Sequence, residues 1–228
     1  MIGIIGAMDI EVDILKADLE ESSTETVSGI EFVLGKLCGK DVVIAKCGIG
    51  KVFAALCSEA MIIKYSPDFI INTGVAGSLS ENLSTLDIAI AKDVVQHDFD
   101  TSALGDKKGE ISGIGEIYIP ADIAVSRAVE GIVKGMGIHC EYGVIASGDQ
   151  FICSAEKKEE IVKEFSAIAC EMEGGAIGHV CRVNKVPFAV VRAISDSADG
   201  SSDMDYSSFA PKAAAVSAKI VENFIMSL

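Results

Sequence analysis

The stretch from residue 170 to residue 196, CEMEGGAIGHVCRVNKVPFAVVRAISD, contains the pattern that decides the fold. A Glu-Met-Glu triplet opens a run of small residues that predicts a helix, and an apolar, β-branched run then predicts a buried strand. Charged residues at both ends of this unit are costly to bury unless they are solvated, paired or used. The spacing of one helix plus one strand allows Glu171–Glu173 and Arg192–Asp196 to lie on the same rim of a sheet.

The rest of the chain repeats this alternation of strands and helices. The predicted strands are Ile2–Ile5, Ile30–Leu37, Val42–Lys46, Phe69–Thr73, Asp87–Ala91, Tyr142–Ser147, Ile168–Glu171 and Phe188–Ala193. The predicted helices are Lys51–Tyr65, Ala121–Met136, Ala155–Phe165, Gly174–Asn184 and Phe209–Met226. Two segments rich in Gly, Ser and charge, Asp98–Gly115 and Ser197–Ser208, are predicted loops. We therefore expect one layered α/β domain over residues 1–228, with a mixed, largely parallel central sheet.

Composition excludes several classes of function. The net charge of −15 opposes binding to the phosphate backbone of nucleic acids. The chain has seven cysteines, an odd number with no CxxC spacing, which favours free thiols in a reducing compartment. The three histidines have no metal-ligand spacing, so we expect neither a metal nor a cofactor.

Hydrophobic residues make up 50% of the chain, but no apolar run is long enough to span a membrane. The N-terminal stretch MIGIIGAMDIE has no basic residue before its apolar part, which argues against a signal peptide. We expect a cytoplasmic protein that does not interact with membranes.

Ligands of α/β sheets bind beyond the carboxyl ends of the strands. These ends predict six candidate site segments: Gly6–Glu11, Gly48–Lys51, Gly74–Ser78, Ser147–Phe151, Glu171–Glu173 and Ser195–Asp196. The glycines of the third segment would let a ligand approach the backbone closely, although packing alone could also require them. Phe151 in the fourth could stack on a flat ring or belong to the core.

The second segment, Cys47-Gly-Ile-Gly-Lys-Val, resembles a phosphate-binding loop. Such a loop requires a glycine five positions before Gly50 and a hydroxyl residue after the lysine. Ala45 and Val52 occupy those positions, so we exclude nucleoside triphosphate hydrolysis.

Six motifs in unbroken order, GIIGAMxxE, CGIGK, NTGxAG, SGDxF, EMEGGAI and VRAISDxAD, together resemble the bacterial 5'-methylthioadenosine/S-adenosylhomocysteine nucleosidases of the nucleoside phosphorylase superfamily. The resemblance covers nearly the whole chain. It implies a three-layer α/β/α fold, a homodimer, thioadenosine nucleosides as ligands, and hydrolysis of their N-glycosidic bond without a cofactor.

The resemblance also implies roles for individual residues. Glu11 matches the general base that activates water, and Asp196 matches the general acid that protonates adenine at N7. Met172 and Glu173 match the ribose-binding pair. The other residues at substrate-binding positions are Met8, Ile49, Gly77, Leu104 (from the partner subunit), Phe151, Ile152, Arg192, Ser195 and Tyr206.

The chemistry of this reaction explains why carboxyl groups are needed. Adenine is a poor leaving group until its ring is protonated, and burial raises the pKa of a carboxyl group so that it keeps a proton to donate. A nearby carboxylate such as Glu173 stabilises the cationic ribose that forms. Within the resemblance, Phe151 would stack on adenine, the backbone of Ile152 would read its edge, and Ser195 would orient Asp196.

Two positions depart from the family pattern. Val75 stands where a hydroxyl residue is common, and Leu104 replaces an aromatic residue of the pocket for the 5' substituent. Neither position is part of the acid–base pair, so they bear only on the preference among 5' substituents. Three alternatives also stay open: a hydrolase of 6-amino-6-deoxyfutalosine, a phosphorolytic enzyme of the same superfamily, and a nucleoside-binding protein without activity. Phosphorolysis is disfavoured because the chain has only three arginines, the first of them Arg127.

Overall fold

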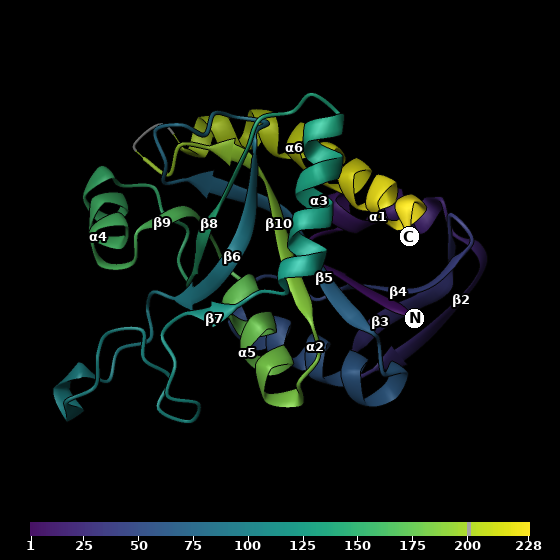
Figure 1. Cartoon of the computed structure of the whole chain (residues 1–228), viewed down its shortest axis with the longest axis horizontal. Coiled ribbons are helices and arrows are strands. Elements are labelled where there is room, and N and C mark those ends of the chain that lie inside the picture. The colour runs from purple at the N-terminus through teal and green to yellow at the C-terminus, as the bar shows by residue number, and fades with distance from the viewer. Residues whose placement is uncertain (200–201) are drawn as a thin grey trace.

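The computed structural model describes residues 1–199 and 202–228, without the side chains of residues 202–205. Strands and helices alternate along the chain (Figure 1). The strands are β1 (Ile2–Gly6), β2 (Glu20–Val27), β3 (Ile30–Leu37), β4 (Lys40–Lys46), β5 (Phe69–Ser78), β6 (Ile88–Gln96), β7 (Ile119–Pro120), β8 (Cys140–Ser147), β9 (Ala167–Glu171) and β10 (Phe188–Asp196). The helices are α1 (Asp9–Ala17), α2 (Lys51–Tyr65), α3 (Ile123–Gly135), α4 (Ala155–Phe165), α5 (Gly174–Asn184) and α6 (Ser202–Ser227), with a short 3-10 turn at Ser102–Leu104.

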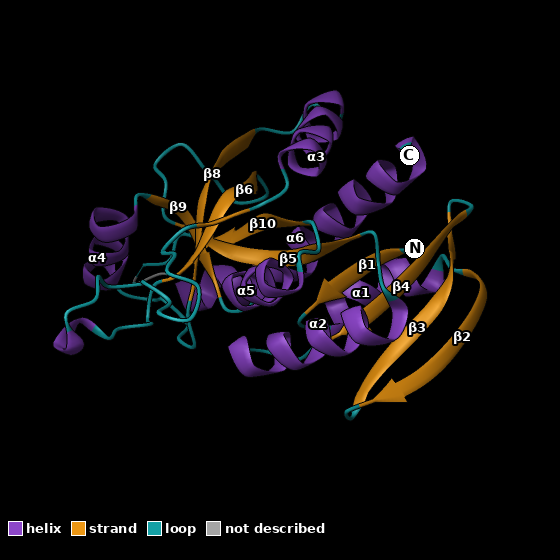
Figure 2. Cartoon of the chain, turned by 60° about the horizontal axis from the view of Figure 1, so that its bottom comes forward, coloured by secondary structure: helices purple, strands orange, loops and turns teal. Residues whose placement is uncertain are grey.

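Helices cover both faces of the sheet, which confirms the three-layer α/β/α architecture (Figures 1 and 2). On one face, buried residues of α1, α3 and α6 such as Leu15, Val133 and Ile220 form a core with the strands. On the other, α2 and α5 pack beside each other and contribute Met61 and Ile177 to a second core. The helix α4 packs near β8 and β9.

The sheet is mixed, as expected. The strands β4, β1, β5 and β10 run parallel, and so do β6, β8 and β9, whereas β10 meets β6 and β5 meets β9 in antiparallel pairs. The pairings β5–β10–β6–β8–β9–β5 close into a ring, from which β1, β4, β3 and β2 extend. The sheet is therefore parallel within the groups β4–β1–β5–β10 and β6–β8–β9, and antiparallel where the two groups meet.

Several boundaries differ from the sequence prediction. The strand β5 continues to Ser78 and β6 continues to Gln96, so the predicted strand ends at Thr73 and Ala91 are wrong. The predicted loop Ser197–Ser208 is wrong from Ser202 onward, because α6 begins there. The elements α1 and β2 were not predicted at all.

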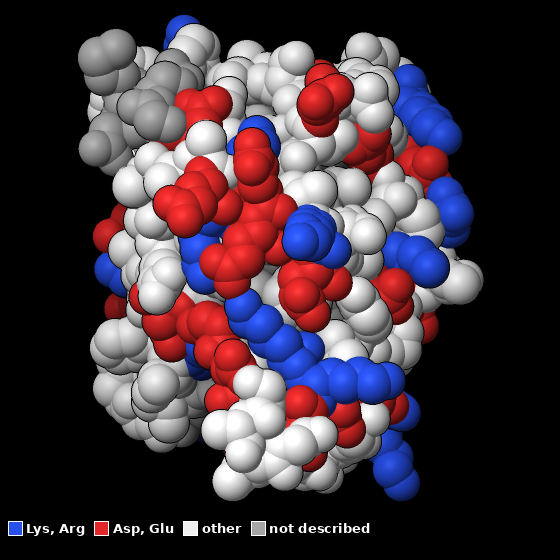
Figure 3. Space-filling view, turned by 90° about the vertical axis from the view of Figure 1, so that its left-hand side faces the viewer, with Lys and Arg blue, Asp and Glu red and all other residues white. Residues whose placement is uncertain are grey.

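No helix in the described part of the chain is long and apolar enough to cross a membrane. On the face that Figure 3 shows, from the side of α4, acidic and basic side chains are interleaved. Ion pairs that involve α4, such as Lys108–Glu160 at 2.5 Å and Lys157–Glu160 at 2.8 Å, are consistent with this pattern.

Candidate active site

A cavity of about 390 Å³ lies where the tips of β1, β5, β9 and β10 meet. All six segments predicted from strand ends contribute to its lining, in full or in part, and Ser147–Phe151 contributes Phe151. The lining residues are Ala7, Met8, Glu11, Ile49, Val75, Ala76, Gly77, Phe151, Cys170, Glu171, Met172, Glu173, Ser195, Asp196 and Tyr206. Four carboxyl groups therefore face one mostly apolar space.

Three of these carboxylates surround the guanidinium of Arg192, which is 1% exposed. Its Nη2 donates to Glu171 Oε2 and lies 3.4 Å from Glu173 Oε2, and its Nη1 lies 4.0 Å from Glu11 Oε1. Nη2 also donates to Asn72 Oδ1 at 2.5 Å. Burial lowers the pKa of Arg192, but the three carboxylates outweigh burial and raise it, so the guanidinium remains charged.

Backbone amides hold Glu11 in the first turn of α1. Its Oε2 accepts hydrogen bonds from the amides of Ala7 (2.6 Å) and Met8 (3.0 Å), and its Oε1 accepts one from the amide of Val75 (3.0 Å). Burial raises the pKa of Glu11, and Arg192 and the three amides oppose this shift. The result is a fixed carboxyl group with a raised proton affinity at the cavity wall.

Glu173 stands at the N-cap of α5 and is held by the start of α2. Its Oε1 accepts a hydrogen bond from the amide of Gly50 at 2.8 Å, and its Oε2 faces Arg192. Burial raises the pKa of Glu173 to about 7, Arg192 lowers it, and the neighbouring Glu171 raises it further. Glu173 is therefore a carboxyl group poised between its neutral and ionised forms near neutral pH.

Asp196 ends β10 and is anchored by its own neighbours. The hydroxyl of Ser195 donates to its Oδ2 at 2.8 Å, and the amide of Ala198 donates to its Oδ1 at 2.9 Å. A Cβ added at Gly77 would lie 2.9 Å from Oδ1, so the glycine leaves this carboxyl group open to the cavity. The predicted pairing of Ser195 with Asp196 is present in the structure.

Apolar side chains form the rest of the cavity. The rings of Phe151 and Tyr206 meet edge to face, with centroids 5.5 Å apart, and the Tyr206 hydroxyl lies 3.3 Å from the sulfur of Met8. Phe151 is 44% exposed, so it is not a core residue. Met172 and Ile49 complete this lining.

Three of the predicted site residues do not line the main cavity. Arg192 lies behind its wall and reaches it through the carboxylates. Ile152 lines an adjoining space of about 30 Å³ that it shares with Phe151 and Asp196. Leu104 is 83% exposed on the segment after β6, where it contributes nothing to the cavity of its own chain.

Sequence reasoning did not assign a role to Glu171, Ser147 or Asn72. Glu171 accepts hydrogen bonds from Arg192, from the hydroxyl of Ser147 and from the amides of Glu173 (3.0 Å) and Gly174 (2.7 Å). It thus neutralises the buried cation and caps α5 at once. The Glu-Met-Glu spacing could have indicated a role for Glu171. Alternate residues of an extended segment face the same side, so Glu171 is expected to point the same way as Glu173.

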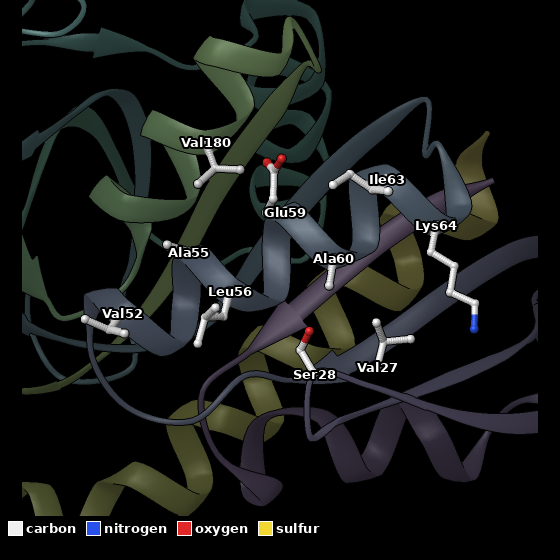
Figure 4. A pocket seen from close by; sticks show the side chains of 10 residues that line it. All are labelled: Val27, Ser28, Val52, Ala55, Leu56, Glu59, Ala60, Ile63, Lys64 and Val180. Atoms are coloured by element: carbon white, nitrogen blue, oxygen red, sulfur yellow. The ribbon is translucent and has the colours of Figure 1, made fainter.

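A second, larger hollow of about 840 Å³ lies on the outer face of α2 (Figure 4). Its lining is mostly apolar, with Val27 and Ser28 of the β2–β3 hairpin on one side and Val180 of α5 on the other. It lacks the cluster of carboxyl groups that marks the first cavity. Within the described residues, no group of three or more His, Cys, Asp and Glu side chains could hold a metal ion.

Comparison with known proteins gives a consistent result. The family profile described as the Phosphorylase superfamily matches residues 1–226. A 5'-methylthioadenosine/S-adenosylhomocysteine nucleosidase of Shewanella loihica is 40% identical over 228 residues, covering 100% of this chain and 99% of the relative.

Solved structures of the same family superpose closely on the chain. The nucleosidase of the same name from Neisseria meningitidis, in complex with methylthio-immucillin-A, superposes with a TM-score of 0.96 at 35% identity, covering 100% of this chain and 99% of the other. A futalosine hydrolase of Helicobacter pylori gives a TM-score of 0.95 at 36% identity, covering 100% and 97%. The chain belongs to the phosphorylase superfamily and, within it, to the 5'-methylthioadenosine/S-adenosylhomocysteine nucleosidases, as its six motifs predicted.

Proposed function

We propose that the protein hydrolyses the N-glycosidic bond of 5'-methylthioadenosine and S-adenosylhomocysteine, releasing adenine and the 5-thio-substituted ribose. One observation carries this proposal: Glu11, Glu173 and Asp196 line a single cavity that is otherwise mostly apolar. Such a cavity fits a nucleoside, with an acid for the base, a carboxylate for the sugar and a base for water.

In this assignment Asp196 is the general acid. It donates a proton to adenine N7, so that the bond between C1' and N9 breaks and adenine departs as a neutral molecule. Its anchoring by Ser195 and Ala198 supports the role, because the carboxyl group is fixed beside the space left by Gly77. Phe151 would stack on the ring, with the backbone of Ile152 at its edge.

Glu11 is the general base. It removes a proton from a water molecule as the water oxygen bonds to C1'. The raised pKa of Glu11 supports this role, since a base works best when its pKa lies closer to the working pH. Arg192 contacts this carboxylate at 4.0 Å and orients it from behind the cavity wall.

Glu173 and Met172 hold the ribose. The amide of Gly50 donates to Oε1 of Glu173, so Oε2 is the atom that accepts hydrogen bonds from the sugar hydroxyls. The carboxylate also stabilises the positive charge that develops on the sugar ring. Met8, Ile49 and Tyr206 then surround the 5' substituent, with Leu104 of a second copy as an additional wall.

This site suits water better than phosphate as the attacking molecule. Phosphate would add negative charge to a cavity that already holds four carboxyl groups. It is best bound by several cationic or amide donors, and the guanidinium of Arg192 is already shared among three carboxylates. Adenine release in phosphate-free buffer distinguishes hydrolysis from phosphorolysis.

The similarity to a futalosine hydrolase favours 6-amino-6-deoxyfutalosine as a second candidate substrate. Its hydrolysis would use the same acid and base and differ only at the 5' end of the pocket. Values of kcat/KM for the three nucleosides, measured side by side, decide between the two assignments.

Asp196→Asn tests the mechanism. Asn is nearly isosteric but is a far weaker acid, so it cannot protonate N7. We expect adenine release to fall by roughly 10² to 10⁴ or more while the fold is retained. A variant that keeps more than about a tenth of the wild-type rate contradicts the assignment of Asp196. A wild-type protein that binds adenine but releases none from nucleosides is a binding protein, not an enzyme.

The same proposal includes a homodimer that works without metal in the cytoplasm. The outer face of α2 exposes Val52 (72%), Leu56 (47%) and Ile63 (71%), an apolar surface suited to an interface (Figure 4). Ile49, two residues before α2 begins, is 55% exposed and lines the cavity. The cysteines are free thiols, four of them buried (Cys47, Cys57, Cys170 and Cys181), which suits a reducing compartment.

We propose that a second copy of this chain covers that surface. Light scattering at micromolar concentration is expected to give the mass of a dimer, and Leu56→Glu to give a monomer with weakened nucleoside binding. A monomeric wild-type protein contradicts the dimer, and loss of activity with a chelator contradicts independence from metal.

A further inference from the structure

The first turn of α2 is the part of the phosphate-loop-like stretch that the proposed function leaves unexplained. The first amides of a helix lack partners within the helix and favour anions. Here the amide of Gly50 donates to Glu173 Oε1 and the amide of Lys51 donates to Asp149 Oδ1, both at 2.8 Å. Carboxylates of the chain itself therefore occupy the place where a phosphate-binding loop holds phosphate.

The side chain of Lys51 closes this arrangement into a ring. Its Nζ donates to Asp98 Oδ1 at 2.5 Å, and Asp98 Oδ2 accepts the amide of Asp149 at 2.8 Å. The side chains of Lys51 and Asp98 are only 17% and 21% exposed. Burial raises the pKa of Asp98, but Lys51 and the Asp149 amide outweigh it and lower the pKa, so the aspartate is ionised.

This ring connects the two halves of the cavity. Asp149 precedes Phe151 by two residues, so its hydrogen bonds restrict the backbone that carries the aromatic ring. The imidazole of His97 packs directly under Gly148, where a Cβ would overlap it, and this leaves the loop little room to shift. On the other side, the neighbouring amide of Gly50 fixes Glu173.

We propose that Lys51, Asp98 and Asp149 are positioning residues that hold the base-stacking loop at a fixed distance from the sugar-binding carboxylate. The identity of the ligand rests on the proposed function. The ring adjoins the cavity at Phe151 and Glu173, which are proposed to bind the base and the sugar, so its loss weakens nucleoside binding more than it slows the chemical step.

The test uses Lys51→Met, Asp98→Asn and Asp149→Ala in the full chain. KM and kcat are measured with 5'-methylthioadenosine, the Kd of adenine by calorimetry, and stability by thermal unfolding. We expect KM and the adenine Kd to rise together by roughly tenfold, as for truncation of a partly buried charged pair, with a smaller fall in kcat. Lys51→Arg keeps the charge and is expected to restore much of the binding.

Two comparisons separate positioning from simple stabilisation. Lys134→Met breaks the Lys134–Glu130 pair on α3 (2.7 Å), away from the cavity, and is expected to leave KM and the adenine Kd unchanged. Because the ring acts as a unit, Lys51→Met combined with Asp98→Asn is expected to bind no more weakly than the worse single variant.

Folded variants with wild-type KM and adenine Kd overturn the inference, as does a lower melting temperature with unchanged affinity. Asp149 is exposed, so Asp149→Ala provides the test even where a change at Lys51 prevents folding. Wild-type protein that releases no adenine contradicts the proposed function instead, and adenine binding by the variants still tests the ring.

Discussion

Glu173→Gln is expected to stabilise the ligand-free protein at alkaline pH while it abolishes efficient hydrolysis. Glu11, Glu171 and Glu173 share the guanidinium of Arg192, and their side chains are at most 5% exposed. When all three are ionised, this buried cluster carries excess negative charge. Replacing one carboxylate with a neutral amide removes part of that repulsion.

The magnitude follows from the pKa of Glu173. Burial raises it from 4.5 to about 7, a difference that corresponds to a ceiling of about 3 kcal/mol. The folded state thus binds this proton more tightly than the unfolded state, so stability is fully present below pH 4.5 and is lost as pH rises through about 7. For a chain of this size, 3 kcal/mol corresponds to roughly 6–12 °C in melting temperature.

The assay is thermal or urea unfolding of wild type and variant at pH 5 and pH 8.5, without ligand. We expect Glu173→Gln to raise the melting temperature at pH 8.5 and to change it little at pH 5, where Glu173 is already neutral. The Gln side chain can still accept the amide of Gly50, so packing is preserved. Adenine release is expected to fall at pH 8.5, where the wild-type carboxylate is ionised and the neutral amide stabilises a cationic sugar poorly.

Glu160 provides a control of opposite sign. Lys108 and Lys157 lower the pKa of Glu160 to about 2, so its contribution to stability is present above pH 4.5 and is lost only as pH falls toward 2. Glu160→Gln is therefore expected to lower, not raise, stability at pH 8.5. The electrostatic reasoning is refuted if Glu173→Gln is less stable than wild type at pH 8.5, or if its melting temperature shifts equally at both pH values.

Three further predictions concern the cavity. Glu11→Gln is expected to lower adenine release by roughly 10² to 10⁴ while adenine still binds, and a near-normal rate would exclude Glu11 as the base. Phe151→Ala is expected to raise KM more than it lowers kcat, because stacking acts in both ground and transition states; a large loss of thermal stability with normal KM contradicts this. Gly74→Ala is expected to lower kcat by about 10², because a Cβ there would overlap Glu11 Oε1 and Arg192 Nη1, and wild-type kcat in a folded variant refutes the proposed displacement.

The location of the site was predictable because it depends on strand ends. Short, β-branched runs such as that ending at Gly6 are buried, and small or acidic residues follow them at the rim. Most of the cavity lining comes from the six segments named on this basis. Strand ends do not predict Tyr206 as a lining residue, because it lies on α6 near the other end of the chain. Only the family resemblance predicted it.

Elements that depend on tertiary pairing were the ones missed. The strand β2 has the sequence EESSTETV and is almost wholly exposed, so it has no apolar alternation to reveal it. Its antiparallel pairing with β3 makes it an edge strand. The closed ring of β5, β10, β6, β8 and β9 depends likewise on which strands meet, and local sequence does not encode those partners.

Arg192 shows how far such reasoning extends. It interrupts an apolar strand in which every residue is buried, and a buried cation requires an anionic partner. The sequence therefore implies at least one carboxylate beside it, yet not which one. The structure supplies three from separate elements: Glu11 from α1, Glu171 from the end of β9, and Glu173 from the start of α5. Because one cation serves several anions, a change in the protonation of any of them alters the others, and the acid–base balance of this cavity belongs to the cluster as a whole.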